Sequence, residues 1–211
     1  GIVSVQFVGN DQIYASVGGK GIVAVDLRTG ASRLISNVFG ILVLSRGGQY
    51  GFVTADVLGR QGRGDMPLTR IEFERGTSSQ VSTHGNAVTA VAIDAHDRWV
   101  ATGSFDGTIR IGPVSGEDPH VLLGQEGGGA IYTLAFSPDG RWIAAAGEGF
   151  RFTVWPVPDL SKRPFHRRPL DSLLKTLKTF TNPGAVPDSA APNGYKLEPG
   201  VFPGWASAPE W

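Results

Sequence analysis

Histidine and carboxylate side chains are the groups in this 211-residue sequence that could perform acid–base chemistry. His84 and Asp106 lie in one stretch of the chain, and a histidine oriented by an aspartate is a common general base. The four histidines are scattered, without the short spacings of metal-binding motifs. Because the chain has no cysteine, thiolate zinc sites, disulfides and a cysteine nucleophile are excluded. We therefore predict no metal and no cofactor, and the pairing of His84 with Asp106 needs an explanation.

Three short motifs have the outline of catalytic sequences but lack required residues. "HRRPLDS" at 166–172 has the start of a kinase catalytic loop, but the spacing of its Asp and Asn fails and no Asp-Phe-Gly follows. "GGKG" at 18–21 lacks the preceding Gly and the following Ser or Thr of a phosphate-binding loop. "SPDG" at 137–140 is a turn sequence, in which Asp139 is expected to face solvent. We predict that the chain is not an enzyme.

Two charged motifs could bind a ligand by other means. The tripeptide "RGD" at 63–65 occurs in adhesion sites but also arises often by chance. A basic cluster could contact phosphates, although a run of this kind is usually a solvated linker. Its members are Lys162, Arg163, His166, Arg167 and Arg168. Since 19 basic residues balance 19 acidic ones, and no apolar run approaches about 20 residues, we expect neither a nucleic-acid nor a membrane partner.

The elements that would position these residues are predicted to be short strands joined by tight turns. In "AFSPDGRWIAAAG", residues 135–147, a Pro-Asp-Gly turn separates two apolar runs. The chain contains 30 Gly and 14 Pro, which is above average usage and indicates many turns. An all-β fold is therefore expected over most of the sequence.

The strand pattern repeats along the chain. Residues 88–111 align without a gap to residues 131–154 at an offset of 43, which lies in the period range of β-propeller blades. Two weaker copies begin near Val3 and Phe39. Equivalent positions in the four copies are Phe7, Leu44, Ile93 and Phe136. Their unequal spacing predicts an insertion at 56–70, between the second and third strands of the second copy.

The sequence resembles the WD-repeat family through "FSPDGRW", "ATGSFDGTIRI" and "FTVW". The resemblance implies a β-propeller of four-stranded antiparallel blades, the last of which could lack its fourth strand. Four or so blades are too few for most closed propellers, so an open array is expected. The expected blades span 1–37, 38–85, 86–128 and 129–156.

The same resemblance implies a structural role for the histidine and aspartate. In the family, a His, a Ser or Thr, an Asp and a Trp form a hydrogen-bonded set that holds each blade together. His84, Thr102 and Asp106 match this set in the third copy, where Gly112 replaces the Trp. The fourth copy keeps Trp155 but has Gly or Ala at the other positions. This interpretation is preferred to a catalytic pair.

The C-terminal part of the chain departs from the repeat. Residues 157–168 are rich in Pro and predict an extended linker, and 169–211 a short helix followed by an extended arm. Leu173, Leu177 and Phe180 lie on one apolar stripe of that helix. The arm, through "TNPGAVPDSAAPNGYKLEPGVFPGW", resembles the C-terminal extension of large bacterial WD-repeat proteins, many of which carry a protein kinase or another signalling domain.

The function that these observations favour is a non-catalytic protein–protein interaction scaffold within a larger bacterial signalling protein. The alternatives are the regulatory part of a serine/threonine kinase and a purely structural spacer. Partner-binding residues are expected on the blade face that carries the insertion; they are Arg60, Arg63, Arg70, Phe105, Tyr132 and Phe150. We also expect self-association through the exposed apolar flank of the first blade. The absence of cysteine suits a cytoplasmic location.

Overall fold

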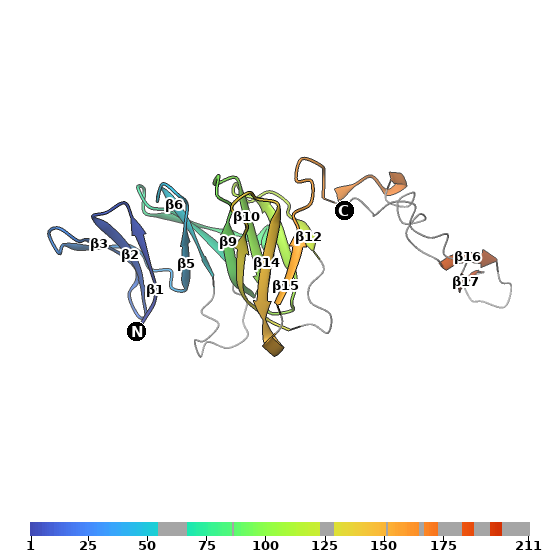
Figure 1. The fold of residues 1–211 in the computed structure, drawn as a ribbon, viewed down its shortest axis with the longest axis horizontal. Helices are drawn as coiled ribbons and strands as arrows, with labels where there is room; N and C mark the ends of the chain where they lie inside the picture. The colour runs from blue at the N-terminus through green and yellow to red at the C-terminus, as the bar shows by residue number, and fades with distance from the viewer. Residues whose placement is uncertain are drawn as a thin grey trace. The chain divides into compact units, whose positions relative to one another are not determined.

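The computed structural model describes residues 1–54, 67–85, 87–122, 129–150, 152–164, 167–172, 183–187 and 195–199. The chain forms two compact units, Gly1–Leu160 and Ser161–Trp211. Figure 1 shows the first unit as a succession of antiparallel sheets. In each sheet, the strands lie side by side in their order along the chain.

Four sheets make up the first unit. Sheet 1 contains β1 (Ile2–Val8), β2 (Gln12–Val17), β3 (Gly21–Asp26) and β4 (Ser32–Ser36). Sheet 2 contains β5 (Ile41–Leu44), β6 (Tyr50–Thr54), β7 (Leu68–Glu72) and β8 (Thr77–Val81). Sheet 3 contains β9 (Val88–Ile93), β10 (Trp99–Ser104), β11 (Ile109–Pro113) and β12 (His120–Leu122). Sheet 4 contains β13 (Ile131–Phe136), β14 (Trp142–Gly147) and β15 (Phe152–Pro156), with no fourth strand among the described residues.

The turn between the first and second strands has the same conformation in all four sheets. Gly9, Gly48 and Gly140 each have a φ between 61° and 71° at this turn, in the region that glycine enters without steric cost. Asp97 occupies the equivalent place with a φ of 57°. The short-range turn signals of the sequence therefore set the boundaries of the strands.

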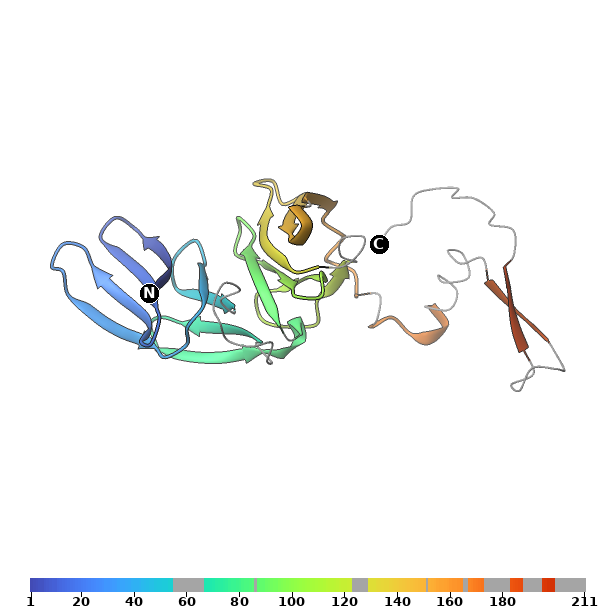
Figure 2. The ribbon, with the colours of Figure 1, turned by 90° about the horizontal axis from the view of Figure 1, so that it is seen from below.

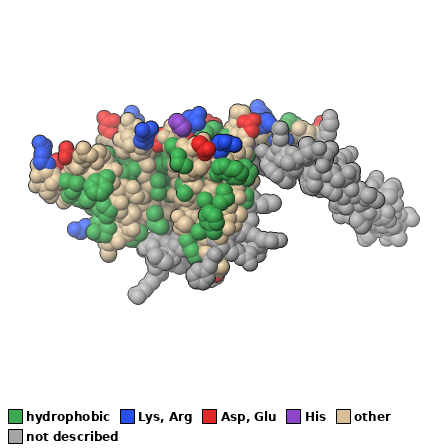
Figure 3. All heavy atoms as spheres, in the orientation of Figure 1, with side chains coloured by type: hydrophobic (Ala, Val, Ile, Leu, Met, Phe, Trp, Pro, Cys, Tyr) green, Lys and Arg blue, Asp and Glu red, His purple; other side chains and the backbone are tan. Residues whose placement is uncertain are grey.

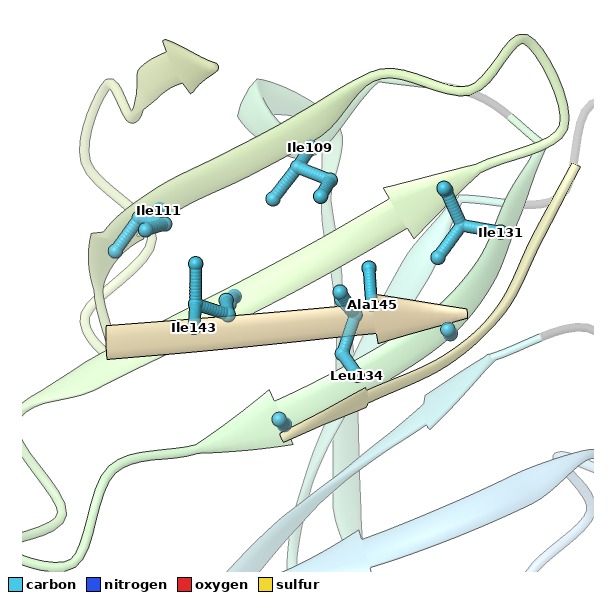
Figure 4. Close-up of a cluster of buried hydrophobic side chains, with 9 residues drawn as sticks. Ile109, Ile111, Ile131, Leu134, Ile143 and Ala145 are labelled. Atoms are coloured by element: carbon cyan, nitrogen blue, oxygen red, sulfur yellow. The ribbon is translucent and has the colours of Figure 1, made fainter. Parts of the chain in front are cut away.

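Consecutive sheets pack face to face, and the hydrophobic core lies between them. Strands β1 and β5, β5 and β9, and β9 and β13 are in contact. Between sheets 3 and 4, Ile109, Ile111 and Ile143 are fully buried, and Figure 4 shows them in the space between the two sheets. Equivalent clusters lie between sheets 1 and 2 and between sheets 2 and 3. Each internal sheet thus has two apolar faces.

The predicted fold class is confirmed. The first unit is built from antiparallel meanders of strands, and the last sheet contains three strands where the others contain four. Figure 2 shows the sheets of this unit along an open arc, with sheet 1 at one end and sheet 4 at the other. Val157 and Leu160, which the sequence assigns to the linker, pack against the core between sheets 3 and 4.

Within the second unit, the structure describes short segments of the chain. Leu170–Ser172 are helical, and the predicted helical residues that follow, 173–180, lie outside the described residues. Two extended segments, β16 (Pro183–Pro187) and β17 (Tyr195–Pro199), pair as an antiparallel hairpin. The sequence predicts an extended arm here and does not predict the pairing.

Candidate protein-interaction surface

Because each sheet is a meander, its connections meet at two opposite ends of the array. We call one end the connection edge: it contains the loops between second and third strands and the loops between sheets. Its described residues are 18–20, 37–40, 67, 82–85, 87, 105–108, 129–130 and 148–150. We call the other end the turn edge, formed by residues 9–11, 27–31, 45–49, 73–76, 94–98, 114–119 and 137–141.

Backbone hydrogen bonds hold the connection edge together in the same way in three sheets. The amide of Gly18 donates to the carbonyl of Gly1 at 2.7 Å, in sheet 1. In sheet 3, the Phe105 amide donates to Ala87 at 3.0 Å. In sheet 4, the Glu148 amide donates to Ala130 at 2.9 Å. The loop after the second strand is therefore tied to the residue that precedes the first strand.

Two of the predicted partner-binding aromatic residues lie exposed at this edge. Phe105 follows β10 directly, and 44% of its surface is exposed. Tyr132 is the second residue of β13, beside an irregularity in the pairing of β13 with β14, and is 48% exposed. Phe150 ends the short turn Glu148–Phe150 at the same edge. Large aromatic surfaces are thus available to a partner on sheets 3 and 4.

Arg70 does not belong to this edge, although the sequence analysis places it there. It lies in the middle of β7, so that the insertion ends before it. Its guanidinium contacts Glu72 at 2.7 Å and lies 4.6 Å from the ring centre of Tyr50, toward the turn edge. Strand pairing places Arg70 opposite Phe52, on the face of sheet 2 that packs against sheet 3. Arg60 and Arg63 lie outside the described residues.

A polar contact between sheets 2 and 3, which the sequence analysis misses, joins Tyr50 to Asp97. The Tyr50 hydroxyl donates to the Asp97 carbonyl at 3.1 Å, and the Asp97 carboxylate accepts the Arg46 amide at 2.9 and 3.0 Å. Burial, followed by the negative charge of Asp97, raises the pKa of Tyr50 to about 12. The signal in the sequence is an Asp at the turn position that Gly occupies in the other three copies.

The residues of the predicted blade-stabilising set lie in three separate places. His84 is fully buried, and its Nδ1 shares a 2.8 Å hydrogen bond with the hydroxyl of Thr102. Asp106 instead accepts hydrogen bonds within its own turn, from the Ser104 hydroxyl and the Thr108 amide. Trp155 is partly buried against the core between sheets 3 and 4.

The acid–base pair considered at the outset is therefore not assembled. Burial first, and then the positive charge of Arg110, lower the pKa of His84 to about 4. Burial alone would raise the pKa of the Asp106 carboxyl, but hydrogen bonds from Ser104 and Thr108 lower it overall. His84 Nε2 has no hydrogen-bond partner and lies 3.2 Å from where a side chain at Gly112 would begin. A neutral, enclosed imidazole of this kind cannot reach a substrate.

Charged side chains gather at the turn edge, where several of them cap turns. The Asp94 carboxylate accepts the amides of Arg98 and Trp99, each at 2.6 Å. Asp26 and Asp139 accept amides in the same manner. Figure 3 shows most charged side chains along the upper rim of the first unit, which is this edge. Within the described part, the loops of the connection edge contain the charged residues Lys20, Asp106 and Glu148, and the guanidinium of Arg110 lies beside Gly85 at this edge.

Among the described residues, no three His, Cys, Asp or Glu side chains come together as a metal site would require. No helix within the described ranges has the length and apolarity needed to cross a membrane.

Comparison with known proteins identifies a repeat. Two segments, 76–111 and 116–155, match the WD40 family, described as WD domain, G-beta repeat. The first match runs from β8 into β11 and the second from β12 to β15, so each repeat supplies the outer strand of one sheet and strands of the next. Among curated proteins, no sequence matches the chain. The two matches and the antiparallel sheets together support assignment of residues 76–155 to the WD-repeat β-propeller family.

Proposed function

We propose that this chain is a non-catalytic scaffold that binds a protein partner through its connection edge. The observation that carries the proposal is the exposure of Phe105 and Tyr132 at the connection edge. Protein-binding hot spots favour aromatic side chains, because these bury a large area and lose little conformational entropy. The WD40 matches support the same role.

The insertion between β6 and β7 extends the proposed surface. Arg60 and Arg63 belong to this insertion, which connects at the same edge as Phe105. Arginine offers a planar group for charge-assisted hydrogen bonds, and its combination with exposed aromatic rings suits an acidic or mixed protein surface. Arg70 is left out of the surface, since Glu72 and Tyr50 engage its side chain.

We further propose that the scaffold serves within a larger bacterial signalling protein. This part rests on the resemblance of the C-terminal arm to the extension of such proteins. Scaffolding would then bring the partner near the domain that signals.

The experiment compares two variants in quantitative affinity capture with the chain as bait. Phe105→Ala/Tyr132→Ala is expected to weaken binding of a captured partner by about 30-fold or more, the loss typical of two interface aromatics. The matched control, Arg28→Ala/Arg141→Ala, removes exposed side chains from the turn edge and should bind as the wild type does. Equal loss in both variants, or loss in the control alone, would overturn the proposal.

A further inference from the structure

The internal sheets bury equivalent positions on the face that meets the preceding sheet. On sheet 2 this face presents Leu42, and on sheets 3 and 4 the equivalent residues are Val91 and Leu134. All three are buried. These three residues are equivalent, because each lies in a first strand two residues before one of the matching positions Leu44, Ile93 and Phe136. This face is an interface wherever a preceding sheet is present.

Sheet 1 presents the same face with nothing packed on it among the described residues. Val5 occupies the equivalent position on β1 and is 46% exposed. Phe7, whose equivalents Leu44, Ile93 and Phe136 are partly buried, is 72% exposed. Ile13, Val23 and Val25 continue the apolar face across the sheet, as their pairing shows. The sheet is built for a neighbour on this side.

Sheet 4 presents the opposite half of the same type of interface. Ile22, Leu68 and Ile109 lie at the start of the third strand in sheets 1 to 3 and are fully buried by the following sheet. The equivalent residue on β15 is Phe152, which is 69% exposed. Val154, two residues further on, is exposed as well.

Both faces are apolar and carry no charge along their strands. The residues on the open face of sheet 1 are Val5, Phe7, Ile13, Ala15, Val23, Val25 and Leu34. The residues on the open face of sheet 4 are Thr133, Ala135, Trp142, Ala144, Ala146, Phe152 and Val154. Figure 3 shows hydrophobic side chains gathered over β1–β2 and over β14–β15. Contact between the two faces therefore desolvates no ionised side chain on either set of strands.

We propose that sheet 4 of one chain packs on sheet 1 of a second copy, repeating the sheet-to-sheet interface found inside the chain. A second copy is the occupant because the chain itself carries both complementary halves. Val5 stands at the position of the buried Leu42, Val91 and Leu134, and Phe152 at that of the buried Ile22, Leu68 and Ile109. The two faces differ, so the contact is head to tail; it closes into a ring or continues from copy to copy. Tyr132 adjoins the open face of sheet 4, because it is equivalent to Thr89, whose hydroxyl bonds to the next sheet. Phe105, on the internal sheet 3, lies outside both open faces and stays available to a protein partner.

The test uses one charge on each face and then combines the variants. Phe7→Glu places a charge on the open face of sheet 1, and Phe152→Glu places one on the open face of sheet 4. Because both side chains are exposed, each variant is expected to keep the fold of a single copy. In analytical ultracentrifugation, the wild type is expected to sediment as a multimer and each variant alone as a monomer. An equimolar mixture retains one intact pair of faces and should give a species of twice the 22.3-kDa chain mass and nothing larger. Leu27→Glu, which changes an exposed residue at the turn edge, should associate as the wild type does.

Each alternative has its own result. A monomeric wild type at high micromolar concentration overturns the proposal and leaves a sheet from outside this sequence as the occupant. A dimer of Phe7→Glu or of Phe152→Glu alone would mean that identical faces meet, and it also overturns the head-to-tail contact. If the equimolar mixture of the two variants stays monomeric, the head-to-tail contact is overturned as well. Loss of partner capture in a Phe105→Ala variant, with association intact, concerns the connection edge alone, because Phe105 lies on sheet 3, away from both open faces.

Discussion

His84 is the most enclosed ionisable side chain in the described part of the chain, and its environment determines its charge. Its ring is fully buried, with one nitrogen bonded to Thr102 and the other beside Gly112, where the family has a tryptophan. Desolvation opposes protonation of such a ring, and Arg110 adds a positive charge nearby. The residue therefore contributes packing and a single hydrogen bond, and it makes folding sensitive to acid.

Lowering the pH should destabilise the chain through His84. The folded-state pKa is about 4, below the value of about 6.5 for an unfolded histidine, so between these values the unfolded state binds a proton that the folded state does not. The contribution of His84 to the free energy of unfolding does not change above that pH window. As the pH drops through the window, this residue lowers the free energy of unfolding by about 3 kcal/mol in all. Urea titrations at about pH 7 and about pH 5 should show a smaller loss for His84→Gln than for the wild type.

The control for this prediction is His96→Gln, because the His96 side chain is 61% exposed. It should lose stability with pH as the wild type does. If His84→Gln and the wild type lose the same amount, the buried imidazole does not control the acid response.

Gly103 is a second residue with tight surroundings, which leave no space for a side chain. A Cβ at this position would lie 2.4 Å from Cγ2 of Ile131 and 2.6 Å from its Cβ, on the neighbouring sheet. Gly103→Ala should therefore cost about 1–3 kcal/mol of stability, as overpacking does. Gly47→Ala is the matched control, since its Cβ would meet only the Gln49 side chain, at 3.3 Å. Thermal unfolding with equal midpoints for both variants would contradict the close approach of the two sheets.

At the scale of the elements, hydrogen bonds supplement apolar packing between neighbouring sheets. The Thr89 hydroxyl on β9 donates to the carbonyl of Ile131 on β13 at 2.5 Å and also lies 3.2 Å from that of Gly103. Between sheets 1 and 2, the Ser4 and Ser16 hydroxyls accept the amides of Leu42 and Gly40. Hydrogen bonds are directional, so these contacts fix the register of one sheet against the next.

Removing the Thr89 hydroxyl should loosen the contact between sheets 3 and 4. Thr89→Val keeps the shape of the side chain and is expected to lower the free energy of unfolding by about 1 kcal/mol, the value of a typical hydrogen bond. Thr77→Val, at the exposed start of β8, should change it by less than about 0.5 kcal/mol. Chemical denaturation measures both variants. Equal free energies of unfolding for Thr89→Val and Thr77→Val would mean that the Thr89 hydrogen bond does not stabilise the interface.

At the scale of the whole first unit, stability should be greatest in the middle of the array. Sheets 2 and 3 have a neighbour on each face, whereas sheets 1 and 4 have one covered face. In stacked repeats, local stability depends on such nearest-neighbour contacts. The two end sheets are therefore the parts that open most readily.

Amide hydrogen exchange tests this gradient. In dilute solution, where copies do not associate, the middle strands β6 and β10 should exchange more slowly than β2 and β14, which occupy the same place in the end sheets. Peptide-level mass spectrometry resolves all four strands. Uniform exchange across them would mean that the array unfolds as one cooperative block.

The sequence by itself determined the strands, the turns and the repeat. Alternating apolar residues and short turns act within a few residues, so the copies marked by Phe7, Leu44, Ile93 and Phe136 all form first strands. The pairing of β16 with β17 escaped prediction, because proline begins and ends β16 and also ends β17, and proline is a poor strand residue.

Only the tertiary structure decided which polar groups meet and which apolar faces remain open. His84 bonds to Thr102 while Asp106 bonds within its turn, and Arg70 extends toward Tyr50 instead of the insertion. These contacts depend on strand register and on how closely one sheet packs on the next, which joins residues far apart in the chain. The exposure of Phe7 and Phe152 has the same origin: their local sequence resembles that of buried positions, and the presence or absence of a neighbouring sheet determines whether they are covered.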